Sequence, residues 1–72
     1  SGQLFGLNAR QMQVMTLVMM GKRNKDIAHE LQLSIKTVEY HLANIHAQLG
    51  AANTKEAVAI VNAAPIATDR AA

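Results

Sequence analysis

Residues 34–50 read SIKTVEYHLANIHAQLG, and this stretch decides the fold. At about 100° per residue, its large apolar side chains fall on one narrow line of a helix. They are Val38, Leu42, Ile45 and Leu49. The spacing predicts a helix over about 35–49 that one face anchors to a core. Ser34 can cap its start by accepting from a backbone N–H, and Gly50 can take the left-handed conformation that ends a helix.

The opposite face of this helix has an unusual composition. It carries one cation, one acid, a tyrosine, an amide and two alanines, whereas a solvated helix usually carries many long charged pairs. Small residues let a helix approach a partner closely. We therefore expect an outward strip that meets a partner, made of Lys36, Glu39, Tyr40, Ala43, Asn44 and Ala47.

Length and composition bound the architecture. The 72 residues make one small domain, for which a compact all-α fold is the default. There is no cysteine, which excludes disulfides and suits a cytoplasmic protein. No apolar run reaches membrane length, so no membrane partner is expected. Ser1-Gly2 resembles the remnant of a cleaved tag, so we interpret residues 1–6 as tag remnant and linker. We also expect a covalently linked regulatory domain that the 72 residues do not include.

Two shorter helices are predicted before the central one. Asn8 and Gln11 have the spacing of a capping box, and Gly21 can end the helix, which places it at about 9–20. Asn24 is a candidate cap for a short second helix, which a tight turn at 31–34 joins to the central helix. Two helices joined by such a turn form a helix-turn-helix, here about residues 24–43.

The first and last helices each carry more apolar surface than one core needs. On the first, Met12, Met19 and Met20 lie opposite the apolar face; they are either flexible filler or a docking surface for another domain. A fourth helix is predicted from a capping box at 53–56 to about Ala64. On it, Ile60 is either buried or meets a second copy. Residues 65–72 have no periodicity, and we expect a mobile tail.

Positive charge gathers before the central helix. The formal net charge is +2, but the first 36 residues carry five cations and two acids, whereas the remaining 36 carry two cations and three acids. A basic cluster of this kind is either a solvated surface or the electrostatic footprint of a nucleic-acid site.

Several blocks of the sequence resemble one family. They are LNARQ at 7–11, NKDIAHEL at 24–31, LS at 33–34, TVEYH at 37–41, NI at 44–45 and LG at 49–50, with Asn53 and Glu56-Ala57 beyond. Together they resemble the LuxR-type helix-turn-helix domain over about residues 7–64. The resemblance implies an all-α domain of four helices that binds DNA, usually at the C-terminus of a bacterial transcription regulator. It also implies that the helix at 35–49 enters the major groove as the recognition helix and that the fourth helix often mediates dimerisation.

The chain departs from the family where sequence would be read. Family members commonly have basic residues at the positions of Glu39 and Ala43, so their operator sequence does not transfer to this chain.

The expected partner is double-stranded DNA, at a two-fold symmetric promoter or operator site bound by a homodimer. Cations and helix-start donors would contact phosphates and fix the register. These candidates are Lys22, Arg23, Asn24, Lys25, Ser34, Lys36 and Thr37. The candidates for base reading are Glu39, Tyr40, Ala43 and Asn44. Tyr40 could instead contact the backbone, and Glu39 could simply be solvated. Ile60 is the dimer candidate.

Nothing in the sequence indicates an enzyme, a metal site or a cofactor. His41 and His46 are about 140° apart around their helix, and no carboxylate completes a ligand set by spacing. We expect His41 to be packed or close to a phosphate, and His46 to be exposed. The alternative function is a helical protein-interaction module, supported by the surplus methionines and the wide apolar arc of the fourth helix.

Overall fold

The computed structural model describes residues 4–63, and these residues form helices joined by short connections. A short 3-10 turn η1 (Leu4–Gly6) leads into α1 (Ala9–Met19), α2 (Asn24–Leu31), α3 (Ile35–Leu49) and α4 (Thr54–Asn62). The predicted all-α, four-helix fold is therefore confirmed. Of the predicted tag remnant and linker at 1–6, residues 1–3 lie outside the described residues, whereas residues 4–6 form η1 and contact α3. The predicted tail at 65–72 also lies outside the described residues.

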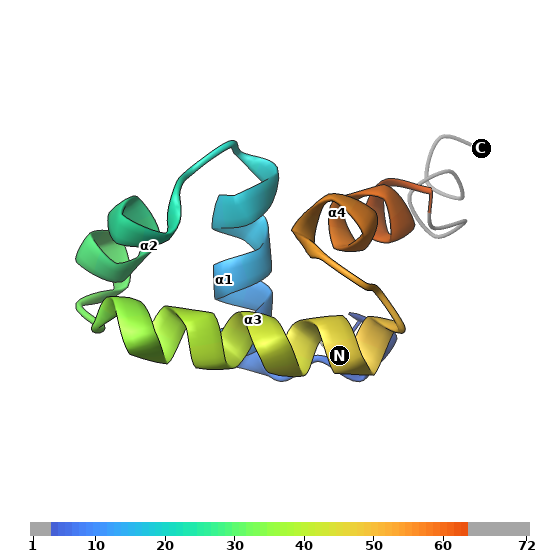
Figure 1. The fold of residues 1–72 in the computed structure, drawn as a ribbon, viewed down its shortest axis with the longest axis horizontal. Helices are drawn as coiled ribbons and strands as arrows, with labels where there is room; N and C mark the ends of the chain where they lie inside the picture. Colours follow the sequence, from blue (N-terminus) through green and yellow to red (C-terminus); the bar gives the residue numbers. More distant parts are fainter. Residues whose placement is uncertain (1–3, 64–72) are drawn as a thin grey trace.

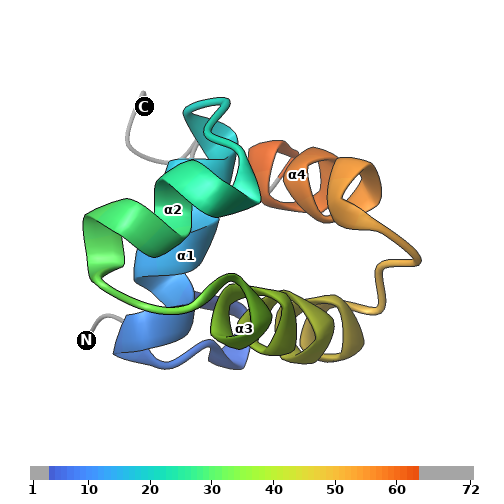
Figure 2. The same ribbon diagram turned by 60° about the vertical axis from the view of Figure 1, so that its left-hand side comes forward.

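Helix α3 is the element that all the others contact. It runs along one side of the molecule, and α1 crosses it at a steep angle (Figure 1). Helix α2 packs near its N-terminal half and α4 lies beside its C-terminal half (Figure 2). Because α1, α2, α4 and η1 all contact α3, one face of α3 is committed to the core.

The core contains residues from every α-helix and from the segment that precedes α1. On α3 it takes the predicted line of apolar residues, with Val38, Leu42 and Ile45 buried and Leu49 half-buried. The other buried side chains are Leu7, Val14, Met15, Ile27, Ala28 and Ala57. Small residues on α2 and α4, Ala28 and Ala57, allow these helices to approach their neighbours closely.

Three predicted helix boundaries depend on local chemistry, and the structure confirms them. Gln11 N–H donates to Asn8 Oδ1 at 2.8 Å, and Asn8 N–H donates to Gln11 Oε1 at 2.9 Å, which completes the capping box of α1. Ser34 Oγ accepts from Thr37 N–H at 3.1 Å at the start of α3. Gly50 ends α3 in the left-handed conformation, with φ of 73°.

Two predicted boundaries need correction. Asn24 does not cap α2, because it is already helical and Arg23 occupies the extended N-cap position. The reason is the spacing of Asp26, whose carboxylate accepts from Arg23 N–H, three residues before it, at 3.4 Å. Helix α4 ends at Asn62, short of Ala64. Its capping box is also incomplete: Asn53 accepts from Glu56 N–H, but Glu56 accepts from Ala52 N–H.

The segment before α1 lies against the C-terminal end of α3. Gly6 has a φ of +78°, and a Cβ placed there would lie 2.6 Å from Gln48 Nε2. The positive φ favours glycine at this position, and a larger residue would also require the Gln48 side chain to move. The turn η1 contacts α3 here.

Candidate nucleic-acid interface

The outward strip of α3 is exposed along its whole length. Each of its six residues is exposed, and the largest, Tyr40, keeps 66% of its surface accessible. The opposite line of the same helix is buried or half-buried. Helix α3 therefore has one face in the core and one exposed face, as the sequence predicted; that the exposed face meets a partner stays a prediction.

One exposed residue beside the strip was missed by the sequence analysis. Ile35, the first residue of α3, is 47% exposed. At about 100° per residue, Ile35 lies between the buried line and the strip, about 20° from Leu42 and about 40° from Glu39, so periodicity alone did not mark it as exposed.

The start of α3 brings three predicted phosphate-contacting residues together. Ser34 and Thr37 are linked through their hydroxyl oxygens at 2.9 Å, and Ser34 also caps the backbone. Lys36 is exposed between them in sequence. A helix start combines backbone donors with the positive end of the helix dipole, so this group suits an anion.

The other predicted phosphate contacts form a separate group, around the connection from α1 to α2. They are Lys22, Arg23, Asn24 and Lys25. Figure 1 shows this connection at the end of α1 that lies away from α3. The structure therefore divides the seven candidates into two groups instead of gathering them in one patch.

Lys22 differs from the other cations because it is already paired. Its Nζ lies 2.9 Å from Glu30 Oε2, across the gap between the loop and α2. The hydrogen bond to Glu30 and the negative charge of that carboxylate raise the pKa of the Lys22 amine. It stays a cation at neutral pH, but much of its charge is compensated locally.

Two of the three histidines, His41 and His46, lie at different places along α3, and His29 lies on α2. The rings of His41 and Tyr40 are 5.8 Å apart in an edge-to-face arrangement, and His41 is half-buried, in accordance with a packed residue. The prediction that His46 is exposed is wrong. It is half-buried, and its Nε2 lies 3.2 Å from Thr54 Oγ1, because the start of α4 folds back over the last turn of α3. Among residues 4–63, no three His, Asp or Glu side chains are grouped in a way that could hold a metal ion.

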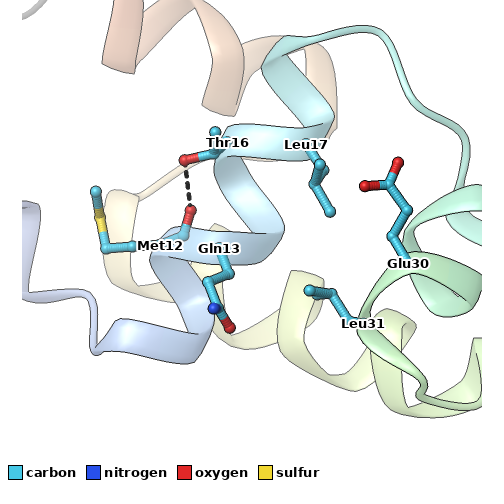
Figure 3. Close-up of a pocket in the computed structure, with 6 residues that line it drawn as sticks. All are labelled: Met12, Gln13, Thr16, Leu17, Glu30 and Leu31. Carbon is cyan, nitrogen blue, oxygen red and sulfur yellow. Dashed lines mark hydrogen bonds between the residues drawn. The ribbon is translucent and has the colours of Figure 1, made fainter.

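The sequence left open whether Met12, Met19 and Met20 are flexible filler or a docking surface for another domain, and the three side chains differ in exposure. Met12 packs against the core, whereas Met19 and Met20 are 39% and 66% exposed. Met12 also lines a shallow groove of about 320 Å³ between α1 and α2 (Figure 3). The groove is otherwise lined by Gln13, Thr16, Leu17, Glu30 and Leu31.

The apolar side chains of α4 also differ in burial. Val58 and Val61 pack against the core, and Ala57 is buried. Ile60 is half-buried but is not among the side chains that pack against the core.

No helix within the described part of the chain is long and apolar enough to cross a membrane.

Known proteins share this sequence pattern. The family described as bacterial regulatory proteins, luxR family, matches residues 6–61. The HTH-type transcriptional regulator MalT of Vibrio cholerae serotype O1 is 42% identical over 52 residues, which are 72% of this chain and 6% of that protein. The transcriptional regulatory protein LiaR of Bacillus subtilis is 37% identical over 51 residues, which are 71% of this chain and 24% of that protein.

The chain thus spans about a quarter or less of the length of these relatives. No solved structure matches it. The family match covers nearly all of the described helices and includes α2, the turn and α3. The chain therefore belongs to the luxR family of bacterial regulatory proteins and is a helix-turn-helix domain of the kind that serves DNA-binding transcription regulation.

Proposed function

We propose that this domain binds a specific sequence of double-stranded DNA, with α3 in the major groove, as the C-terminal output domain of a bacterial transcription regulator. The observation that carries the proposal is the two-sided character of α3, whose buried line anchors it while the outward strip stays exposed. A major groove about 12 Å wide admits a helix in this way. The proposed location is the cytoplasm, where bacterial DNA lies.

Affinity in this proposal comes from phosphate contacts at the two groups of candidates. Lys36, with the hydroxyls of Ser34 and Thr37, would hold the phosphate next to the groove that α3 enters. Arg23, Asn24 and Lys25 would hold phosphates at the start of α2. Lys22 would contribute least of the cations, because Glu30 already compensates its charge.

Sequence reading in this proposal comes from four residues of the strip. Glu39 would accept from the amino group of cytosine, and Ala43 would pack on the methyl group of thymine. Asn44 would bond to adenine or to a phosphate, and Tyr40 would contact a base edge or the sugar. The proposal assigns these roles from exposure and side-chain chemistry.

Two copies would bind a two-fold symmetric site. Half-sites would be about 34 Å apart, or a multiple of that distance, because each copy must meet the same side of the duplex. Ile60 is the proposed contact between copies, supported by its partial exposure outside the core.

The second candidate function is a protein-interaction module without base reading. The exposed Met19 and Met20 favour it, because flexible methionines are common at binding surfaces. In the proposed scheme this surface is a secondary feature of a DNA-binding domain.

A salt titration of binding to duplex DNA tests the proposal. We expect the logarithm of the binding constant to fall linearly with the logarithm of salt concentration on a mixed-sequence duplex. Selection from a random pool should also enrich a two-fold symmetric sequence. A protein-interaction module would show neither the slope nor the enrichment.

A further inference from the structure

Ile35 is the most exposed aliphatic side chain on α3 among the large hydrophobic residues, with 47% of its surface accessible. The other exposed large hydrophobics of the described chain lie on η1 and at the end of α1, apart from Tyr40, which belongs to the outward strip. An apolar side chain at the start of a helix that meets DNA therefore needs its own explanation.

The fold does not need an isoleucine at this position. Ile35 is not part of the core and is not among the half-buried side chains that pack against it. The cap of α3 is supplied by Ser34, and the first-turn hydrogen bond goes to Thr37. A β-branched residue also gives no advantage over alanine at the start of a helix.

Ile35 is at the N-terminal end of α3, the end that would contact base edges in the proposed function. Residues four apart form a row along a helix, and Ile35, Glu39 and Ala43 form such a row with all three exposed. From Ile35 to Ala43 the helix rises about 12 Å. This rise corresponds to roughly three or four base-pair steps of about 3.4 Å, so the two ends of the row meet different base pairs. In helix-turn-helix proteins the N-terminal residues of the recognition helix contact base edges.

We infer that Ile35 is a specificity-determining residue that packs on the 5-methyl group of a thymine in each half-site. This inference rests on the proposed function. Among the four bases, only thymine presents an apolar group in the major groove. An aliphatic side chain without hydrogen-bonding atoms therefore selects thymine, at a base pair separate from the one that Ala43 meets.

The experiment uses the 72-residue chain and the duplex that selection from a random pool enriches. Each thymine of one half-site, and its symmetry mate, is replaced by deoxyuridine, which removes only the methyl group. Dissociation constants are measured for the parent chain, for Ile35→Ala and for Ile35→Val. Met20→Ala is the matched control, because Met20 is an exposed apolar residue just after α1. Circular dichroism checks that each variant keeps its helices.

The parent chain and Met20→Ala should lose about fourfold in affinity per half-site at a thymine other than the one that Ala43 meets, the equivalent of one buried methyl group. Ile35→Ala should bind the thymine duplex more weakly and lose nothing further on deoxyuridine at that position, and Ile35→Val should fall between. If every deoxyuridine costs Ile35→Ala as much as it costs the parent, the role of Ile35 is refuted while DNA reading stands. If selection enriches no sequence at all, the proposed function fails and this inference fails with it.

Discussion

The replacement of Lys36 by alanine tests whether the start of α3 holds a phosphate. Three cations are exposed near the two helix starts without a carboxylate partner in the described chain, Arg23, Lys25 and Lys36, whereas Lys22 is paired with Glu30. If each neutralises one phosphate, a bound dimer neutralises about six, and the salt slope is about −5.4. Lys36→Ala removes two of these contacts per dimer, so the slope should change to about −3.6.

The difference between the two slopes gives a large difference in how much affinity is lost as salt rises. Between about 50 and 200 mM salt, the parent should lose roughly 2,000-fold and Lys36→Ala roughly 150-fold. Fluorescence anisotropy on two duplexes of unrelated sequence measures both slopes. The matched control is Lys55→Ala, which makes the same charge change on α4 and should keep the parent slope.

Two results would refute this reasoning. An unchanged slope in Lys36→Ala would show that this side chain meets no phosphate. A loss of affinity confined to one of the two duplexes would show that Lys36 reads bases instead.

Five further substitutions, at four residues, test the structure. Lys22→Ala should change the salt slope by less than Lys36→Ala, measured by the same titration; an equal change would contradict its pairing. Ser34→Ala should lower the free energy of unfolding by about 1 kcal/mol in urea titrations, whereas Ser34→Asp should keep the cap yet weaken DNA binding. Ile60→Asp should abolish self-association in analytical ultracentrifugation and keep its helices by circular dichroism; an unfolded variant would place Ile60 in the core instead. Ile45→Ala should cost about 2–5 kcal/mol and unfold much of the chain at 25 °C, because the side chain is fully buried and a domain of this size has only a few kcal/mol to lose.

The parts of the fold that depend on neighbours in sequence could be predicted. The Asn8–Gln11 box and the Ser34 cap each join residues three apart, so their chemistry is visible in the chain itself. The buried line of α3 followed from helical periodicity alone. The cap of α2 was misplaced because two residues, Arg23 and Asn24, competed for one position and the spacing of Asp26 decided between them.

The parts that depend on how helices meet could not be predicted. The contact of His46 with Thr54 arises only because α4 folds back over α3, and no periodicity within either helix shows it. The pairing of Lys22 with Glu30 likewise joins a loop to the far end of α2. In the candidate site, the exposed strip followed from helical periodicity. The cations form one cluster in the sequence but two groups in the structure, because the α1–α2 connection lies away from the start of α3.

The approach of Gly6 to Gln48 places the first described residues beside the C-terminal end of α3. Gln48 lies about 18 Å along α3 from Lys36, since twelve residues separate them at about 1.5 Å each. The first described residues and the phosphate candidates around Lys36 therefore lie at opposite ends of one helix. The turn η1 packs on α3 without covering the exposed start of that helix.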